Sequence, residues 1–70
     1  MKEYWLINVP GKYGYSLLVN TEASCVEEAI EIAMDADLFD DSEDAKYAYG
    51  EVADESTIKH FNSFGFTHFL

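Results

Sequence analysis

Two short runs of branched and aromatic residues, joined by turn-forming residues, place the strongest limit on the fold of this chain. Residues 4–9 read YWLINV and residues 15–20 read YSLLVN, compositions that favour β-strands. The letters PGKYG between them supply the proline and glycines of a turn. Together these features predict an antiparallel hairpin at the start of the chain.

Alternation along the two strands divides the hairpin into two unequal faces. Side chains two residues apart share a face. One face therefore carries six large groups: Trp5, Ile7, Val9, Tyr15, Leu17 and Val19. Leu6 and Leu18 lie on the opposite face, so we expect that face to be partly covered as well.

A helix is predicted over about residues 25–36. Ser24 and Glu27 have the spacing of a capping box, in which the serine oxygen accepts from an early helical N–H and the glutamate reaches back. The apolar residues that follow recur at helical spacing and form a narrow stripe: Val26, Ala29, Ile30, Ala33 and Met34.

The last third of the chain predicts one more strand and one more helix. KYAYGEVA at residues 46–53 has strand character. Asp54 and Ser56 are alternative N-caps for a short helix that Gly65 would end. The final letters FTHFL predict a short edge strand or a docked tail.

These elements predict a single compact α+β domain over residues 1–70, with one main and one short helix packed on a small antiparallel sheet. The sheet would contain the hairpin and one or two further strands. The lone Cys25 cannot form an intramolecular disulfide, and we expect it to be a partly buried structural cysteine. Since the chain lacks a long apolar span and a signal-peptide layout, we expect a soluble intracellular protein.

Charge is the feature that departs most from an ordinary small domain. Fourteen acidic residues face four lysines and no arginine, which gives a net charge of −10. Thirteen of the fourteen lie between residues 22 and 55, where Lys46 is the only base. Direct binding to nucleic acid or to an anionic membrane needs clustered basic residues, so both are disfavoured. The eleven aromatic residues argue against the disorder that acidic chains often show.

The densest acidic stretch, DADLFDDSEDA at residues 35–45, raises a metal-binding alternative. Counted from Asp40, oxygen-bearing side chains fall at positions 1, 3, 5 and 12 of a calcium loop. However, Ala45 occupies position 6, where that loop requires glycine. His60 and His68 lack metal-ligand spacing, and we read them as packed or surface histidines. We expect no metal site and no cofactor.

An enzyme is also disfavoured. A catalytic general acid needs an apolar pocket that raises its pKa, and a chain of 70 residues has little room for one. The sequence contains neither a glycine-rich phosphate loop nor a plausible Ser-His-Asp set. We therefore expect a binding protein.

A row of carboxylates along the predicted helix is the strongest candidate for a functional surface. Glu27, Glu31 and Asp35 would line up at steps of about 6 Å, a spacing at which like charges destabilise a helix by about 0.2–0.5 kcal/mol per pair. B-DNA presents one phosphate per about 3.4 Å on each strand. The row has a comparable charge density when it is continued by the acidic residues that follow it, Asp37, Asp40, Asp41, Glu43 and Asp44. We predict a partner-binding surface of eleven residues: Glu27, Glu28, Glu31, Asp35, Asp37, Asp40, Asp41, Glu43, Asp44, Tyr47 and Tyr49.

The apolar residues around the acidic stretch have their own expected roles. Leu38 and Phe39 should pin the stretch to the core, because they are its only bulky apolar residues. Tyr47 and Tyr49 would share one face of the third strand. We expect at least one of them in the core, and an exposed one would serve as an interface anchor.

Short length, a β-β-α-β start, a helix entered through TEASCVEEAIEIA and a strongly acidic surface resemble the small anti-defence proteins of bacteriophages and mobile elements. The anti-CRISPR proteins and the DNA-mimicking anti-restriction proteins are the nearest groups. The resemblance covers the layout and contains no diagnostic motif. It implies a DNA mimic in the cytoplasm of a bacterial host that docks on a CRISPR effector or restriction enzyme, as a monomer or weak homodimer.

Other functions fit the same acidic surface. One is an acidic adaptor that binds a basic protein without competing with nucleic acid. Another is an acidic face that serves solubility alone, since surface charge varies easily. Competition between the protein and DNA for one partner would distinguish the inhibitor from the adaptor.

Overall fold

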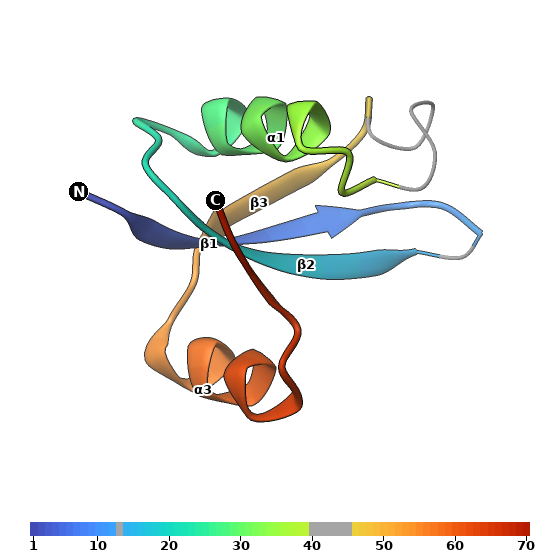
Figure 1. The fold of residues 1–70 in the computed structure, drawn as a ribbon. Helices are drawn as coiled ribbons and strands as arrows, with labels where there is room; N and C mark the ends of the chain where they lie inside the picture. Colours follow the sequence, from blue (N-terminus) through green and yellow to red (C-terminus); the bar gives the residue numbers. More distant parts are fainter. Residues whose placement is uncertain (13, 40–45) are drawn as a thin grey trace.

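The computed structural model describes residues 1–12, 14–39 and 46–70. In these residues, a four-stranded sheet carries one helix on each face (Figure 1). The elements in chain order are β1 (Glu3–Val9), β2 (Tyr15–Thr21), α1 (Val26–Asp35), β3 (Tyr49–Val52), α3 (Glu55–Phe64) and β4 (Thr67–Phe69). The predicted α+β class is confirmed.

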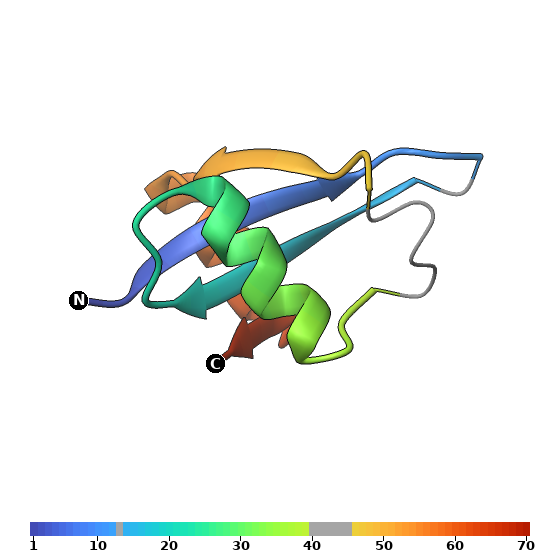
Figure 2. The same cartoon turned by 90° about the horizontal axis from the view of Figure 1, so that it is seen from above.

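The sheet is mixed rather than wholly antiparallel. Its strand order is β3-β1-β2-β4, and β1 pairs antiparallel with both of its neighbours. β4 pairs with β2 in parallel. The chain leaves β3 at one edge, passes through α3 on one face and returns as β4 at the other edge (Figures 1 and 2). Such a crossover is what a parallel arrangement requires, and the final letters FTHFL form an edge strand.

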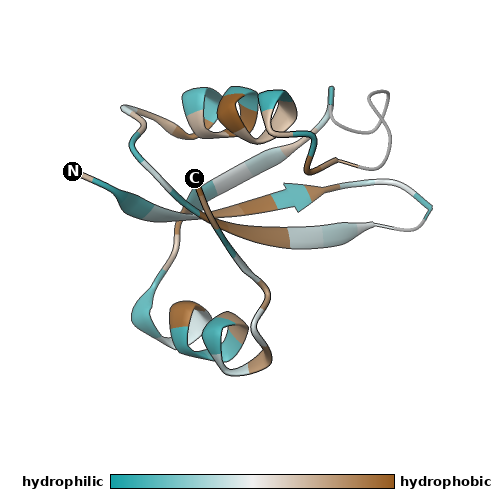
Figure 3. Ribbon diagram, in the orientation of Figure 1, coloured by the Kyte–Doolittle hydropathy of each residue, from teal (hydrophilic) through white to brown (hydrophobic). Residues whose placement is uncertain are grey.

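The main core lies between α1 and one face of the hairpin. The register pairs Trp5 with Val19 and Ile7 with Leu17, which confirms the face predicted from alternation. Ala29 and Ala33 of α1 are fully buried against this face. Their small side chains let the helix backbone approach the sheet closely. Figure 3 shows the apolar stretches of β1 and β2 between the two helices.

The second face of the sheet is covered by α3, and the cover is thinner. Leu18 has no exposed surface, whereas Leu6 beside it is half-buried. Ile58 and Phe61 of α3 are also half-buried, and no residue of this helix is fully buried. The predicted partial cover of this face is therefore confirmed.

α3 begins and ends with strong local signals. Asp54 is the N-cap, and its carboxylate accepts from the Thr57 N–H at 2.7 Å. That backbone bond, together with a bond from the Thr57 hydroxyl, holds the pKa of Asp54 below its ordinary value of 3.8. Gly65 follows the helix in the left-handed conformation with φ of 71°. Of the two alternative N-caps predicted, Asp54 is the one used, and the predicted stop at Gly65 is also present.

Candidate partner-binding surface

The start of α1 differs from the predicted capping box by one residue. Cys25 occupies the N-cap position without a side-chain hydrogen bond. The Ser24 hydroxyl and amide donate to the two oxygens of Glu28, at 3.1 and 3.3 Å. Glu28 rather than Glu27 therefore holds the chain before the helix. The Glu27 side chain remains available at the surface, where it is exposed.

Cys25 is exposed, so the prediction of a partly buried cysteine is wrong. The reason lies in the phase of the helix. α1 turns Val26 and Ala29 toward the sheet, and the N-cap residue lies before the first turn, off this stripe.

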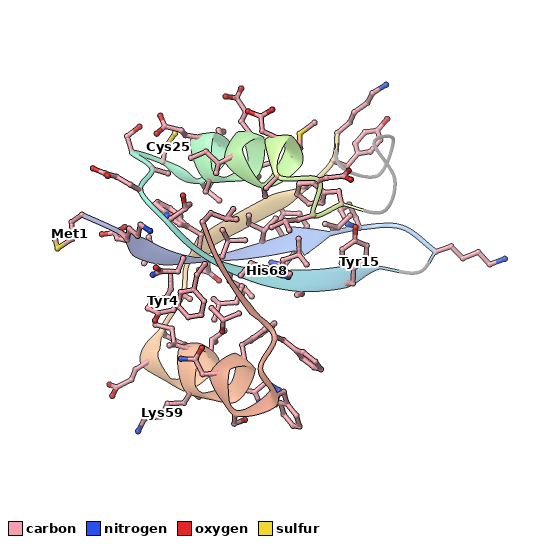
Figure 4. The ribbon with its side chains drawn as sticks, viewed as in Figure 1. Met1, Tyr4, Tyr15, Cys25, Lys59 and His68 are labelled. Carbon is pink, nitrogen blue, oxygen red and sulfur yellow. The ribbon has the colours of Figure 1, made fainter. Side chains whose placement is uncertain are left out.

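The outer face of α1 carries a row of exposed carboxylates. Glu27, Glu31 and Asp35 are all exposed. Carboxylate side chains stand on the side of α1 that points away from the sheet (Figure 4). Among residues 1–12, 14–39 and 46–70, the side chain of none of these three takes part in a hydrogen bond or an ion pair. We call these three residues the acidic row.

Met34 also lies on this outer face, which corrects the predicted apolar stripe. It is 44% exposed, whereas Val26 and Ile30 pack against the core. Met34 comes seven residues after Glu27, about two full turns of a helix, so the two side chains emerge on the same side. One exposed apolar side chain therefore lies beside the acidic row, at its margin.

The end of α1 fixes the chain beyond the acidic row. Asp37 adopts φ of 61° and is the only non-glycine residue with positive φ in the described part of the chain. Its N–H donates to the Met34 carbonyl at 3.0 Å, and the Leu38 N–H donates to the Ala33 carbonyl at 3.1 Å. This pair of bonds is a Schellman motif.

Leu38 and Phe39 follow directly and are half-buried against the core. The prediction that they pin this end of the acidic stretch is confirmed. Since Asp37 is exposed and precedes them on a fixed backbone, its carboxylate continues the acidic row.

Part of the predicted surface lies outside the described residues. This applies to Asp40, Asp41, Glu43 and Asp44, and with them to the calcium-loop alternative that starts at Asp40. Within the three described ranges, no group of three or more His, Cys, Asp or Glu side chains is placed to hold a metal ion.

The two tyrosines of the predicted surface lie outside α1, in β3 and in the turn before it. Tyr47 and Tyr49 are 71% and 61% exposed, so the prediction that at least one lies in the core is wrong. β3 begins only at Tyr49, and Tyr47 lies in a turn before it. Tyr49 pairs with Asn8, which alternates with the core residue Ile7. Tyr49 therefore lies on the sheet face opposite α1.

Sequence reasoning did not assign the exposed aromatic residues near the C-terminus to a site. Phe64 and Phe66 are stacked with ring centroids 5.8 Å apart, and His60 contacts Phe64 edge-on at 5.1 Å. Phe69 contacts Tyr4 edge-on at 6.4 Å. The signals for this cluster were the four-residue spacing of His60 and Phe64 and the phenylalanines on either side of Gly65.

Comparisons with known proteins found no relatives. No protein-family model, no curated protein and no solved structure matches this chain. None of the helices in the described ranges is long and apolar enough to cross a membrane. What the chain does must therefore be inferred from its own surfaces.

Proposed function

We propose that this protein is an acidic inhibitor that occupies the positively charged nucleic-acid site of a bacterial defence effector and blocks DNA binding as a DNA mimic. A CRISPR complex is the first candidate partner and a restriction enzyme the second. The observation that carries the proposal is the acidic row, Glu27, Glu31 and Asp35, exposed and unpaired on one side of a packed helix.

The spacing of the acidic row supports recognition by a phosphate-binding groove. One turn of helix separates successive carboxylates by about 6 Å along the axis, against about 3.4 Å between phosphates on one strand of B-DNA. A groove lined with Lys and Arg attracts such a surface over long range and accelerates association. The convex outer side of a helix also suits entry into a groove.

The row is held rigidly, which favours binding over mere solubility. Buried Ala29 and Ala33 fix α1 on the sheet, Glu28 secures its start, and the bonds around Asp37 close its end. Carboxylates in a fixed array lose little conformational entropy when a partner binds them. Met34 supplies an apolar contact within the same surface.

Two rules of helix stability are broken along the row, each by the placement of negative charge. Like charges four residues apart oppose helix formation. Asp35 and Asp37 lie at the C-terminal end of α1, where the helix dipole favours cations, and no basic residue lies in the last turn. Losses of helix stability that are concentrated in one place are typical of a site selected for function.

The proposal is tested by competition for DNA. A purified effector, such as a CRISPR complex, is loaded with fluorescently labelled target DNA and titrated with this protein, and the anisotropy of the DNA is followed. We expect stoichiometric displacement that weakens as salt rises. If the effector binds this protein and its DNA together with undiminished affinity, the protein is an adaptor and the inhibitor proposal fails.

A further inference from the structure

The C-terminal edge of the sheet presents a second surface of opposite character to the acidic row. Three phenylalanines are 60–65% exposed there: Phe64, Phe66 and Phe69. We call these three side chains, with His60, the aromatic patch: His60, Phe64 and Phe66 are in successive ring contact, and Phe69 lies against Tyr4. A groove at the patch is lined by seven residues: Ser16, Leu17, Phe61, Gly65, Phe66, Thr67 and His68.

The backbone of β4 has hydrogen-bonding groups that face away from the sheet. Among the strands of the described residues, β4 is an edge strand and pairs with β2 alone. The Leu70 N–H donates to the Asn20 carbonyl at 2.9 Å, so Leu70 faces β2, and His68 two residues earlier faces β2 as well. In a parallel ladder alternate residues face opposite sides. The N–H and C=O groups of Thr67 and Phe69 therefore point outward.

This edge has only one of the features that usually protect an exposed strand. Protective edges carry charged side chains or proline, or are very short. β4 has the last feature only, since its three residues are Thr, His and Phe. The opposite edge strand, β3, contains Glu51 and is followed by Asp54 and Glu55.

Charge indicates what can cover the patch. Residues 56–70 contain no Asp or Glu, although the whole chain has a net charge of −10. Two copies of such a chain repel each other wherever carboxylates meet. Residues 4–21 and 56–70 are the two long stretches without Asp or Glu, and only the second carries the three exposed phenylalanines. Two copies can therefore approach through the aromatic patch without bringing their acidic residues together.

We propose that a second copy of this chain covers the aromatic patch, so that the protein forms a symmetric homodimer through α3 and the β4 edge. A two-fold axis places the same patch on both sides of the interface. The rings of each copy then pack on those of the other, and the outward groups of Thr67 and Phe69 can pair between the two β4 strands.

The area available sets the expected strength of the dimer. A phenylalanine ring exposed to this extent offers about 100–150 Å², so the three rings supply about 300–450 Å² per copy. A standard interface buries about 800 Å² per partner. The rings alone supply about half of that, and repulsion between acidic chains opposes association. The dimer is therefore expected to be weak and concentration-dependent.

The dimer is independent of the proposed function. α1 covers the other face of the sheet, so the acidic rows of both copies stay exposed in the dimer (Figure 1). Failure of DNA competition would leave the dimer intact, and a monomeric protein could still displace DNA.

The test is the mass in solution, measured by sedimentation equilibrium from about 10 μM to about 1 mM, the range in which weak association becomes visible. We expect the mass to rise from 8.0 kDa toward twice that value. Association should strengthen as sodium chloride is raised, because salt screens the repulsion between the chains. A mass of 8.0 kDa at every concentration and salt level would overturn the proposal and assign the patch to another partner.

Matched variants locate the interface. Phe66→Glu and Phe69→Glu each add one negative charge to the patch, and Tyr47→Glu adds one to an equally exposed aromatic position away from it. We expect the first two to weaken association at least tenfold and the third to change it little. Equal weakening by all three would show that net charge alone controls association, and no weakening by Phe66→Glu or Phe69→Glu would place the interface elsewhere.

A measurement on the unmodified chain covers the case in which a variant fails to fold. Amide chemical shifts are recorded over the same concentration range. Concentration-dependent shifts are expected at residues 64–69 and at Tyr4, which contacts Phe69. Shifts confined to α1 or β3 would overturn the proposal.

Discussion

The backbone amide of Leu38 donates to the carbonyl of Ala33 at 3.1 Å, and this bond closes α1 over a residue in the left-handed conformation, Asp37. α3 ends in the same way, with the Phe66 amide bonded to the Phe61 carbonyl and Gly65 in the left-handed position. Glycine adopts this conformation without steric cost, whereas aspartate does not. The two helices therefore share one stop motif and differ in the residue at its centre.

Replacing Asp37 by glycine should stabilise the fold. Asp37→Gly removes the steric cost and also a carboxylate at the negative end of the helix dipole, for a gain of about 0.5–1 kcal/mol. Asp37→Asn, which removes the charge but keeps a side chain that tolerates this conformation, should give a smaller gain. Urea unfolding measures both. If Asp37→Gly lowered the free energy of unfolding, the prediction would be wrong and the Asp37 side chain would be stabilising the end of α1.

Neighbouring glutamates at the start of α1 should respond differently to truncation. Glu28→Ala removes the acceptor for the Ser24 hydroxyl and amide and should cost about 0.5–1 kcal/mol. Glu27→Ala relieves repulsion from Glu31 but also removes a negative charge from the first turn, where the helix dipole favours it. The two effects oppose each other, so Glu27→Ala should change the stability less than Glu28→Ala does. Thermal unfolding of the two variants, measured side by side, compares their changes in stability. A larger loss from Glu27→Ala would restore the capping box first predicted from the sequence.

Asp54 should make part of the stability depend on pH at the acid end. Bonds from the Thr57 amide and hydroxyl hold the pKa of Asp54 below 3.8 in the folded state. A lowered pKa in the folded state means that its contribution is fully present above the unfolded value and is lost as pH falls through the folded one. Asp54→Asn keeps an acceptor at the cap but cannot titrate.

The difference in unfolding free energy between wild type and Asp54→Asn should therefore be constant from pH 5 to 7 and shrink below about pH 3.8. Glu55→Gln provides the control, because it changes the charge equally and leaves the bond between Asp54 and Thr57 in place. A difference that stayed constant down to pH 2 would contradict the assigned cap.

Gly50 should tolerate no side chain. A Cβ atom at this position would lie 2.1 Å from the Leu6 carbonyl oxygen, a backbone atom that cannot move without disturbing β1. Overpacking of this kind costs about 1–3 kcal/mol or more. Gly65→Ala is the comparison, since a Cβ atom there meets no atom of the described residues within 4 Å and the cost comes from the left-handed backbone. Denaturant unfolding should rank Gly50→Ala as the more damaging change.

The elements with strong local signals could be predicted from the sequence. Alternation placed Trp5 and Val19 on one face of the hairpin, and the observed register, in which they pair, keeps the apolar side chains of both strands on that face. The Asp54 cap and the Gly65 stop depend on residues next to each other in the chain. The outward position of Glu27 and Glu31 follows from helical spacing once Ala29 and Ala33 face the core.

Features that depend on distant parts of the chain could not be predicted. The parallel pairing of β4 with β2 depends on the edge of the sheet at which α3 ends, and no residue of β4 determines the direction of the strand. Tyr49 looked like a core residue, but β3 is an edge strand and its position opposite Asn8 faces away from α1. The aromatic patch was overlooked because aromatic side chains are more often buried.

The most direct test of the central claim is displacement of labelled target DNA from a CRISPR effector by two variants of equal charge. Glu27→Gln/Glu31→Gln/Asp35→Asn neutralises the acidic row, and Glu3→Gln/Glu51→Gln/Glu55→Gln neutralises three exposed carboxylates elsewhere. Each takes the net charge from −10 to −7, since three negative charges are removed. We predict that the first loses displacement by at least tenfold while the second stays close to wild type. Equal activity of the two variants, or loss in the second alone, would contradict the role assigned to the outer face of α1.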